Sequence, residues 1–213
     1  MSRIEPLRFE ELPAEAKPIL EYAQQLMGFV ANDVLIMARW PELLLAMQQM
    51  VSVVYGQGQL DDGLKRLVGL VTSAAAGCRY CQAHTAHGAS LVPGMSPEKV
   101  AAVWDFESNE LFDDRERAAL RIARGAGQNP NAVTDAEFSD LRQYFDAHEV
   151  MELMGVICLF GFLNRWNDTL ATELETVPLN FASGNLPVES WTPGKHVSNC
   201  SSDRKNNVAE KCC

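Results

Sequence analysis

The spacing of apolar residues constrains the fold of this chain more than any other feature, because nearly every strong pattern repeats with the period of an α-helix. In residues 63–76, for example, Leu64, Leu67 and Val71 lie three or four positions apart and so share one helix face. The short β-branched pieces, such as residues 51–55, sit inside helical patterns. The sequence therefore predicts an all-α protein with a compact multi-helix fold.

Glycine, proline and capping residues divide this pattern into separate helices. Gly77, for instance, ends one helix directly before Cys78, and Val92-Pro93-Gly94 ends the next. Thr134 and Glu137 form a capping box. On these signals we expect helices over about residues 13–26, 41–55, 63–76, 78–91, 96–106, 113–127, 134–145 and 148–173.

We expect one helical domain over residues 1–176, with the core of the protein at about residues 41–127. From Val177 onward the helical period is lost, which predicts an extended arm over residues 177–196. Trp191 is a large apolar group, so this arm should dock on its own core or on a neighbouring subunit. Residues 197–213 are polar and are expected to be disordered.

The chain has a formal net charge of −10 and lacks a basic patch, which argues against a nucleic-acid partner. The most apolar run, residues 156–163, is shorter than the roughly 20 residues of a membrane-spanning helix. The first 20 residues are acidic and contain prolines, unlike an export signal. These features predict a cytoplasmic protein without a membrane partner, in a compartment that keeps thiols reduced.

The residues with the most distinctive chemistry are gathered between positions 72 and 90. Cys78 and Cys81 form a C-x-x-C motif, and His84 and His87 follow at steps of three. Residues three apart are neighbours on a helix, but each step falls short of a full turn. Cys81 should therefore adjoin both Cys78 and His84, while His87 lies farther round the helix.

Three interpretations of this group remain open. As a redox pair, one thiolate attacks and the other thiol resolves, helped by the helix start after Gly77 and by His84 as a base, with His87 a more distant base. As a zinc site, the two cysteines and two histidines are nominal ligands, although one continuous helix cannot easily wrap an ion. In the third interpretation the cysteines belong to the core and the histidines to the surface.

The motif and its surroundings resemble the alkylhydroperoxidase D-like, or carboxymuconolactone decarboxylase, superfamily. The resemblance is carried by AAAGCRYCQAHTAHGA after LKRLVGLVTSA. It continues through FDDRERAALRIARGAGQNPNAVTDAEFSDLRQYF to FLNRWNDTLATELE and SWTPGKH. It spans about residues 28–196 and leaves the tail outside.

This resemblance implies an all-helical fold, assembly into a homo-oligomer, and thiol-dependent reduction of small-molecule hydroperoxides. Cys81 would attack the peroxide and Cys78 would resolve it to a disulfide. An external dithiol, on a lipoyl- or thioredoxin-type reductant protein, would restore the reduced pair. The resemblance implies neither a bound cofactor nor a metal.

The sequence departs from the superfamily pattern at the proton relay. Arg66 stands where the relay glutamate is expected, and Thr85 stands where the histidine is expected. His84 would then relay the proton together with Tyr80 or a water molecule. Arg66 would face solvent or, if it points inward, lower a thiol pKa by its charge.

Other polar residues and cysteines receive simpler interpretations. We expect Asn164, Arg165, Asn167 and Asp168 to form a packing or subunit-contact network, with substrate contact as the alternative. Cys158 is expected to be a small core residue. His196 is expected to have no chemical role, and the tail cysteines to be incidental exposed thiols.

The sequence therefore favours an enzyme: a thiol-dependent peroxide reductase that uses Cys81 and Cys78. Two other hypotheses remain. One is a decarboxylase-type member that acts on a lactone, and the other is a non-enzymatic redox-sensing oligomer.

Overall fold

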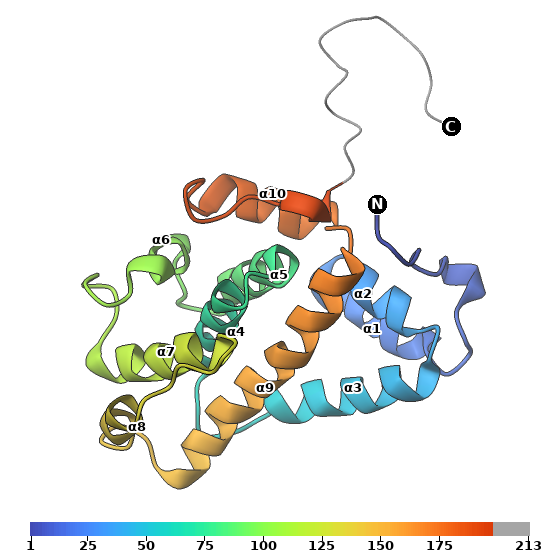
Figure 1. The fold of residues 1–213 in the computed structure, drawn as a ribbon. Coiled ribbons are helices and arrows are strands. Elements are labelled where there is room, and N and C mark those ends of the chain that lie inside the picture. Colours follow the sequence, from blue (N-terminus) through green and yellow to red (C-terminus); the bar gives the residue numbers. More distant parts are fainter. Residues whose placement is uncertain (198–213) are drawn as a thin grey trace, which may run out of the picture.

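The structure is a computed structural model that describes residues 1–197. These residues form helices and contain no strand, which confirms the all-α prediction (Figure 1). The expected tail, with Cys200, Cys212 and Cys213, lies outside the described residues except for position 197. The α-helices are α1 (Lys17–Met27), α2 (Asn32–Met37), α3 (Pro41–Val54), α4 (Asp62–Ala75), α5 (Arg79–Ser90), α6 (Pro97–Ala101), α7 (Asp114–Gly127), α8 (Asp135–Leu141), α9 (Ala147–Leu170) and α10 (Thr176–Asn185). Short 3₁₀ turns are η1 (Phe9–Glu11), η2 (Ala102–Asp105) and η3 (Gly194–His196).

Several helices begin at residues whose side chains cap the backbone, and α4 is followed by a glycine that allows a turn. The Asp61 side chain accepts a hydrogen bond from the backbone of Leu64 at 2.9 Å and so caps α4. Capping boxes start α7 at Asp113 and α8 at Thr134. Gly77 follows α4 with a φ of +77°, a left-handed conformation that glycine adopts at little cost.

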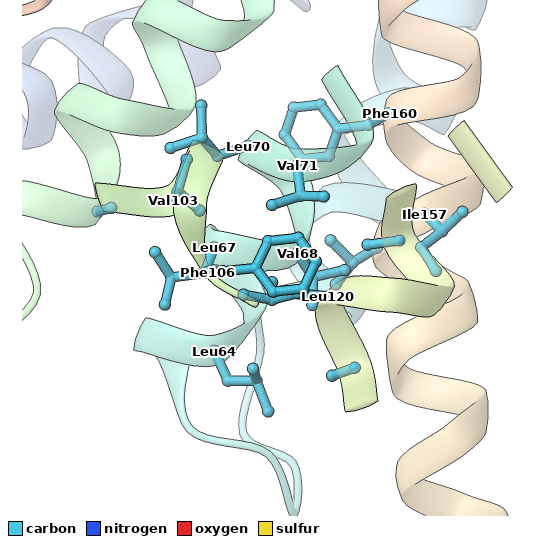
Figure 2. Close-up of a cluster of buried hydrophobic side chains, with 14 of the residues drawn as sticks. Leu64, Leu67, Val68, Leu70, Val71, Val103, Phe106, Leu120, Ile157 and Phe160 are labelled. Carbon is cyan, nitrogen blue, oxygen red and sulfur yellow. The ribbon is translucent and has the colours of Figure 1, made fainter. Parts of the chain in front are cut away.

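Helix α4 lies at the centre of the fold and packs against α5, α7 and α9. Its apolar face, including Leu67 and Val68, meets Leu120 of α7 and Phe160 of α9 in one buried cluster (Figure 2). Gly69 lets the Phe160 ring approach closely, because a Cβ there would lie 2.5 Å from a ring carbon. Each fully buried large apolar side chain stabilises the fold by about 1.5–3 kcal/mol relative to exposure.

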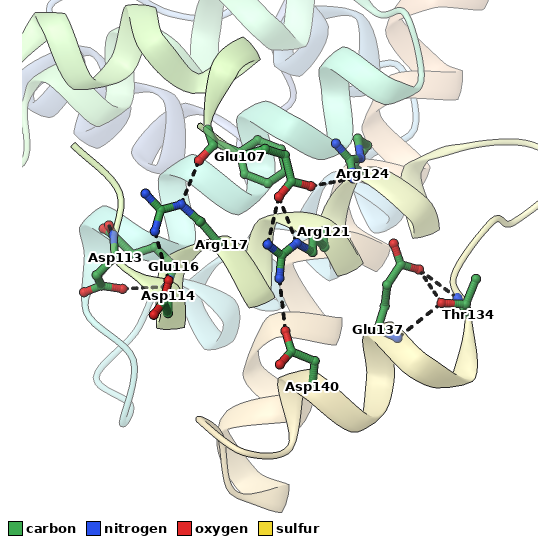
Figure 3. A network of polar contacts seen from close by, with 11 residues as sticks. Glu107, Asp113, Asp114, Glu116, Arg117, Arg121, Arg124, Thr134, Glu137 and Asp140 are labelled. Carbon is green, nitrogen blue, oxygen red and sulfur yellow. Dashed lines mark hydrogen bonds and ion pairs between the residues drawn. The ribbon is translucent and has the colours of Figure 1, made fainter. Parts of the chain in front are cut away.

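Ion pairs fasten the outer helix α7 to its neighbours. Arg121 and Arg124 both bind Glu107, at 2.9 and 2.8 Å, and Arg121 also reaches Asp140 of α8 at 3.0 Å (Figure 3). These groups are partly exposed, so each pair contributes at most about 1 kcal/mol. The pair between Arg121 and Asp140 helps to position α8, and these surface pairs add little to the stability of the core.

Helix α9 is long and apolar enough to cross a membrane by length and composition alone. Within its most apolar window 39% of the residues are buried in the protein. The helix packs against α3, α4, α5 and α7, as the central helix of a helical core does. A single helix of this kind is weak evidence for a membrane location.

The arrangement differs from the sequence prediction in three segments. The arm is not extended throughout, because residues Thr176–Asn185 form α10, whose first turn tolerates Pro178. Helix α2 was not expected, and α8 ends at Leu141 rather than near position 145. Of the two docking sites expected for Trp191, the structure shows the protein's own core, where this side chain is 3% exposed and its Nε1 donates to the Arg79 carbonyl at 3.1 Å.

Candidate active site

Cys78 and Cys81 lie where α5 begins, under cover of the surrounding helices. Cys78 is the N-cap residue, and its backbone N–H donates to the Ser73 carbonyl at 3.1 Å across the turn made by Gly77. Cys81 follows in the first helical turn. Both are free thiols, and both are buried, with exposures of 0% and 3%. The sequence thus places the pair at a helix N-terminus, where a negative charge on sulfur is stabilised.

The two thiols differ in acidity. A hydrogen bond from the Cys81 thiol holds the pKa of Cys78 below its usual value, against the effect of burial, and the backbone N–H groups of Cys81 and Tyr80 add to the lowering. Burial raises the pKa of Cys81 well above its usual value, and the bond to Cys78 raises it further. These directions favour Cys78 as the thiol that loses its proton first. The resemblance implied the opposite order, with Cys81 as the attacking residue.

Asn167 of α9 connects Cys81 to α2. Its Nδ2 donates to Asp33 Oδ2 at 3.0 Å and lies 3.5 Å from Cys81 Sγ. Asn167 is fully buried, and burial also raises the pKa of Asp33. The Asp33 carboxyl group is thus linked to Cys81 through one amide.

His84 forms its closest polar contact with Glu175, the residue that precedes α10. Its Nε2 lies 2.6 Å from Glu175 Oε2, while the Tyr80 hydroxyl and the backbone N–H of Asn32 donate to Oε1. The Tyr80 ring stacks on His84 with 4.3 Å between ring centroids. Burial lowers the pKa of His84, but the charge of Glu175, the hydrogen bond with Glu175 and the charge of Asp33 together outweigh burial, so the pKa is raised overall. Glu175 therefore supplies an acid beside His84, although Arg66 occupies the position expected for one.

His87 and Arg66 lie in other surroundings. The His87 ring is near Phe29 and Phe181, at 6.1 and 5.7 Å between centroids, and burial lowers its pKa. The Arg66 guanidinium stacks on the Tyr55 ring at 4.0 Å rather than facing solvent freely. Burial raises the pKa of that tyrosine to about 12. The structure brings His84 and Tyr80 together with Glu175, but it does not bring His87 or Arg66 into that group.

A second group of polar residues lies beside Cys78. His196 was expected to have no chemical role, yet this side chain is fully buried and close to Cys78 and Asp168. The cysteine sulfur, an aspartate oxygen and a histidine nitrogen all lie within 4.8 Å of one another. A polar cluster was predicted on the last long helix. Two of its four residues, Asn167 and Asp168, lie close to Cys81 and Cys78.

Cysteine, histidine and aspartate are also the usual ligands of zinc. Here Asp168 is already paired with Lys195 Nζ at 2.8 Å, and Cys78 already accepts hydrogen bonds from the start of α5. Because the protein itself balances both anionic groups, the arrangement fits proton transfer better than metal binding. The nominal zinc ligand His84 is directed to Glu175 instead.

Two adjoining hollows run along α9. The larger has a volume of about 900 Å³ and a mainly apolar lining that includes Trp40, Phe162 and Cys158, so Cys158 is exposed rather than a core residue. The smaller has a volume of about 370 Å³ and is bounded by polar groups that include Asn164 and Asp168. They share the lining residues Ala126, Gly161, Arg165 and Thr169. Asp168, which lines the smaller hollow, also belongs to the group of atoms within 4.8 Å that includes the Cys78 sulfur.

Sequence reasoning missed Glu175, Asp33 and His196 because each comes from a segment far from the C-x-x-C motif. Asn167 and Asp168 carried a detectable signal, since polar residues within the apolar pattern of a central helix need buried partners. The other three carried none, because their role depends on how α2 and the C-terminal segment pack on α5.

Comparison with known proteins places these residues in a family. Residues 41–125 match the model of the carboxymuconolactone decarboxylase family. The protein YnjA of Escherichia coli (strain K12) is 30% identical over 144 residues, which are 65% of this chain and 79% of YnjA.

Solved structures extend the similarity over most of the fold. The debrominase Bmp8 superposes with a TM-score of 0.78 at 27% identity, covering 84% of this chain and 96% of Bmp8. A cysteine-to-alanine variant of Bmp8 in complex with 2,3,4-tribromopyrrole gives a TM-score of 0.79. An alkylhydroperoxidase AhpD core protein from Ralstonia eutropha JMP134 gives 0.75 at 22% identity, covering 87% of this chain and 97% of that one, and supports the fold alone.

Proposed function

Because the chain belongs to the carboxymuconolactone decarboxylase family and has the fold of AhpD-like proteins, we propose that it is a thiol-dependent hydroperoxide reductase. One observation carries the proposal: two reduced, buried cysteines lie at the N-terminus of α5, and the pKa of Cys78 is lowered by hydrogen bonds from Cys81 and from the helix start. A thiolate is the nucleophile that peroxide reduction requires.

The reaction consumes both thiols. The Cys78 thiolate attacks one peroxide oxygen, the O–O bond breaks, and the alcohol leaves with a proton while Cys78 becomes a sulfenic acid. The Cys81 thiol then attacks that sulfur, a disulfide forms, and the hydroxyl leaves as water with the Cys81 proton. The peroxide has gained two electrons and the pair has lost two. The acidity of the thiols supports this order over attack by Cys81, which the resemblance implies.

An external dithiol must return the two electrons and two protons. It attacks the disulfide, passes through a mixed disulfide and leaves oxidised. A lipoyl- or thioredoxin-type protein would supply this dithiol in the cytoplasm, and no bound cofactor is needed. Both sulfurs are buried, so this exchange needs the C-terminal segment over α5 to open.

The hollows favour an organic hydroperoxide over hydrogen peroxide. The apolar space of about 900 Å³ has the size of a small-molecule site. It adjoins the polar hollow that Asp168 helps to line, and the Asp168 carboxylate lies within 4.8 Å of the Cys78 sulfur. An apolar substituent would occupy the larger space while the peroxide group approaches the cysteines.

Reductive dehalogenation is a second candidate, favoured by the similarity to the debrominase Bmp8. In that reaction the thiolate would take bromine from an aromatic carbon, which gains a proton in its place. Attack by the second thiol would then release bromide and form the same disulfide. Both candidates use the cysteine pair, so they differ in substrate and not in redox chemistry.

The deciding experiment measures substrate consumption by the reduced protein with dihydrolipoamide as reductant. We expect cumene hydroperoxide to be consumed, and Cys78→Ser and Cys81→Ser each to lose turnover. Cys200→Ser, a cysteine of the polar tail, is the matched control and should keep it. Full turnover in Cys78→Ser would contradict attack by Cys78, and full turnover in both single variants would refute the redox pair. Consumption of tribromopyrrole, with no consumption of peroxide, would select the dehalogenase.

Two remaining hypotheses are separated by simple measurements. Lactone decarboxylation needs no redox pair, so an activity that survives thiol alkylation would favour it. Exposed apolar side chains on the α3 and α9 side, such as Trp40 (61%), Val53 (75%) and Met151 (63%), support a homo-oligomer. Light scattering of reduced and oxidised protein tests whether assembly changes with the disulfide, as a redox sensor requires and an enzyme does not.

A further inference from the structure

His196 is held in one tautomer by the fold. Its Nδ1 lies 2.7 Å from the carbonyl oxygen of Thr172, and because a carbonyl only accepts, Nδ1 carries the hydrogen. In the neutral ring Nε2 then has a free lone pair. This atom is buried and has no hydrogen-bond partner among residues 1–197. A histidine that is 0% exposed with an unpartnered nitrogen needs an explanation.

The His196 ring lies close to Cys78 and Asp168. Cys78 Sγ, the Asp168 carboxylate and the His196 ring form the group whose atoms lie within 4.8 Å of one another. The Asp168 Oδ1 atom is 3.6 Å from Nε2. The backbone fixes the histidine in place, because the Leu174 N–H donates to the His196 carbonyl at 2.8 Å.

We propose that His196 Nε2 is the base that takes the proton of the Cys78 thiol, and that Asp168 stabilises the imidazolium that forms. The proposal rests on the thiol chemistry of the proposed function and adds the residue that activates it. A gap of up to 4.8 Å suits a resting state, since hydrogen bonds of catalytic groups often tighten only when substrate is bound. Burial lowers the pKa of His196, which keeps the ring neutral and able to accept a proton.

The proton then has a defined path. It leaves Cys78 for Nε2, and the sulfur keeps the electron pair that attacks the peroxide. When the O–O bond breaks, the alkoxide takes that proton from His196 and leaves as the alcohol. His196 returns to its neutral state, so the step balances without another acid.

The charged and titratable groups around Cys78 and His196 come from three elements. They are Tyr80 and Cys81 on α5, Asp168 on α9 and Lys195 on η3. The charge of Lys195 disfavours the protonated His196 ring, whereas the charge of Asp168 favours it. Lys195 also pairs with Asp168. His196 and Asp168 together are the base and its counter-charge.

The test measures the pH dependence of Cys78 alkylation by iodoacetamide in EDTA with a phosphine reductant. Trypsin cuts after Arg66, Arg79 and Lys99, so Cys78 and Cys81 fall on different peptides, residues 67–79 and 80–99, and mass spectrometry reports each separately. His196→Asn keeps an amide in place of Nδ1 to donate to Thr172 and removes Nε2. His196→Gln is a second variant that also lacks the base.

We expect the midpoint of Cys78 alkylation to move to higher pH in both variants. A midpoint shift of about one pH unit lowers the rate at pH 7 about tenfold. The midpoint is compared because access to a buried thiol changes the plateau and not the midpoint. His148→Gln, a histidine with 67% side-chain exposure on α9, is the control and should leave the profile unchanged.

An unchanged midpoint in either folded variant would overturn the proposal, and a lower melting temperature without a midpoint shift would assign His196 a structural role only. The assay uses no peroxide, so its result is independent of the proposed function. A midpoint shift in a protein that consumes no hydroperoxide would retain the base and reject the peroxidase. Peroxide turnover with the same pH profile in wild type and His196→Asn would retain the peroxidase and reject the base.

Discussion

Replacing Glu175 by glutamine tests the polar group that it forms with His84 and Tyr80. The glutamate accepts from Tyr80 at 2.8 Å, from the Asn32 backbone, and pairs with His84 at 2.6 Å. Its side chain is only 10% exposed. Glu175→Gln keeps the shape and one acceptor oxygen but removes the charge, so at least one donor loses its partner.

The expected cost follows from those bonds. A hydrogen bond to a charged group contributes about 1.5–3 kcal/mol, so losing the charge should cost about 3 kcal/mol in all. For a chain of this length that lowers the melting temperature by roughly 6–12 °C. The lowered pKa of Glu175 and the raised pKa of His84 limit the effect to a pH window. The Glu175–His84 pair stabilises the fold fully only at pH values above the ordinary carboxyl pKa. This stabilisation is lost as pH rises through the pKa of His84.

Histidine NMR titration measures the cause directly. In wild type the pKa of His84 should lie above the ordinary value of about 6.5, and in Glu175→Gln it should fall below, because burial remains while the opposing charge is gone. Thermal melts at pH 6 and pH 9 should show the larger difference at pH 6. Glu189→Gln, an exposed glutamate beyond α10, should change neither. An unchanged His84 titration in Glu175→Gln would refute the assigned role of Glu175.

Three further predictions concern the scaffold. Glu152→Gln leaves Lys65, 1% exposed, without its counter-ion at 3.0 Å and should destabilise by about 3 kcal/mol in chemical denaturation. Since the pKa of Glu152 is lowered to about 2, the wild-type advantage should persist near neutral pH and fade as pH falls below about 4.5. Gly69→Ala places a Cβ against Phe160 and should cost about 1–2 kcal/mol despite the better helix propensity. Trp191→Ala should cost about 3–5 kcal/mol and speed alkylation of both active-site cysteines by a bulky maleimide.

Each of these three scaffold variants has a matched control at an exposed position. Asp114→Asn breaks a surface ion pair at a residue with 77% side-chain exposure and should change stability by less than about 1 kcal/mol. Gly184→Ala on α10 meets no atom within 4 Å and should be neutral or stabilising. Val188→Ala, 70% exposed in the Trp191 segment, should not speed alkylation. If a control matched its test variant, the contact assigned to the buried residue would be wrong.

The parts of the fold that depend on local sequence could be predicted. The caps at Asp61, Asp113 and Thr134 and the left-handed turn at Gly77 are decided within a few residues, and they lie where the sequence indicates. The segment of α10 was misjudged because Pro178 and the small residues after it weaken a helical pattern. A proline in the first turn costs little, and packing against α5 supplies the rest.

The site could be predicted only as far as the helix that carries it. The position of Cys78 and Cys81 at a helix start follows from Gly77, but the acidity of each thiol depends on contacts with distant segments. Helical spacing placed His84 beside Cys81, whereas the charge on Glu175 draws its ring nitrogen elsewhere. Neither Glu175 nor His196 is marked by any local pattern.

The C-terminal segment serves both sides of the cysteine pair. It brings Glu175 to His84 and Tyr80 on α5 and His196 to Cys78, and it is fastened to α5 by Trp191. Because Glu175 pairs with His84 whereas His196 lies near Cys78, the two thiols meet different environments although they lie one turn apart. An unequal pair is what a dithiol enzyme requires, since one sulfur must hold the charge while the other keeps its proton until the first is oxidised. Release of this segment would remove both acid–base groups at once, so we expect its docking to control thiol reactivity as much as its access to the reductant.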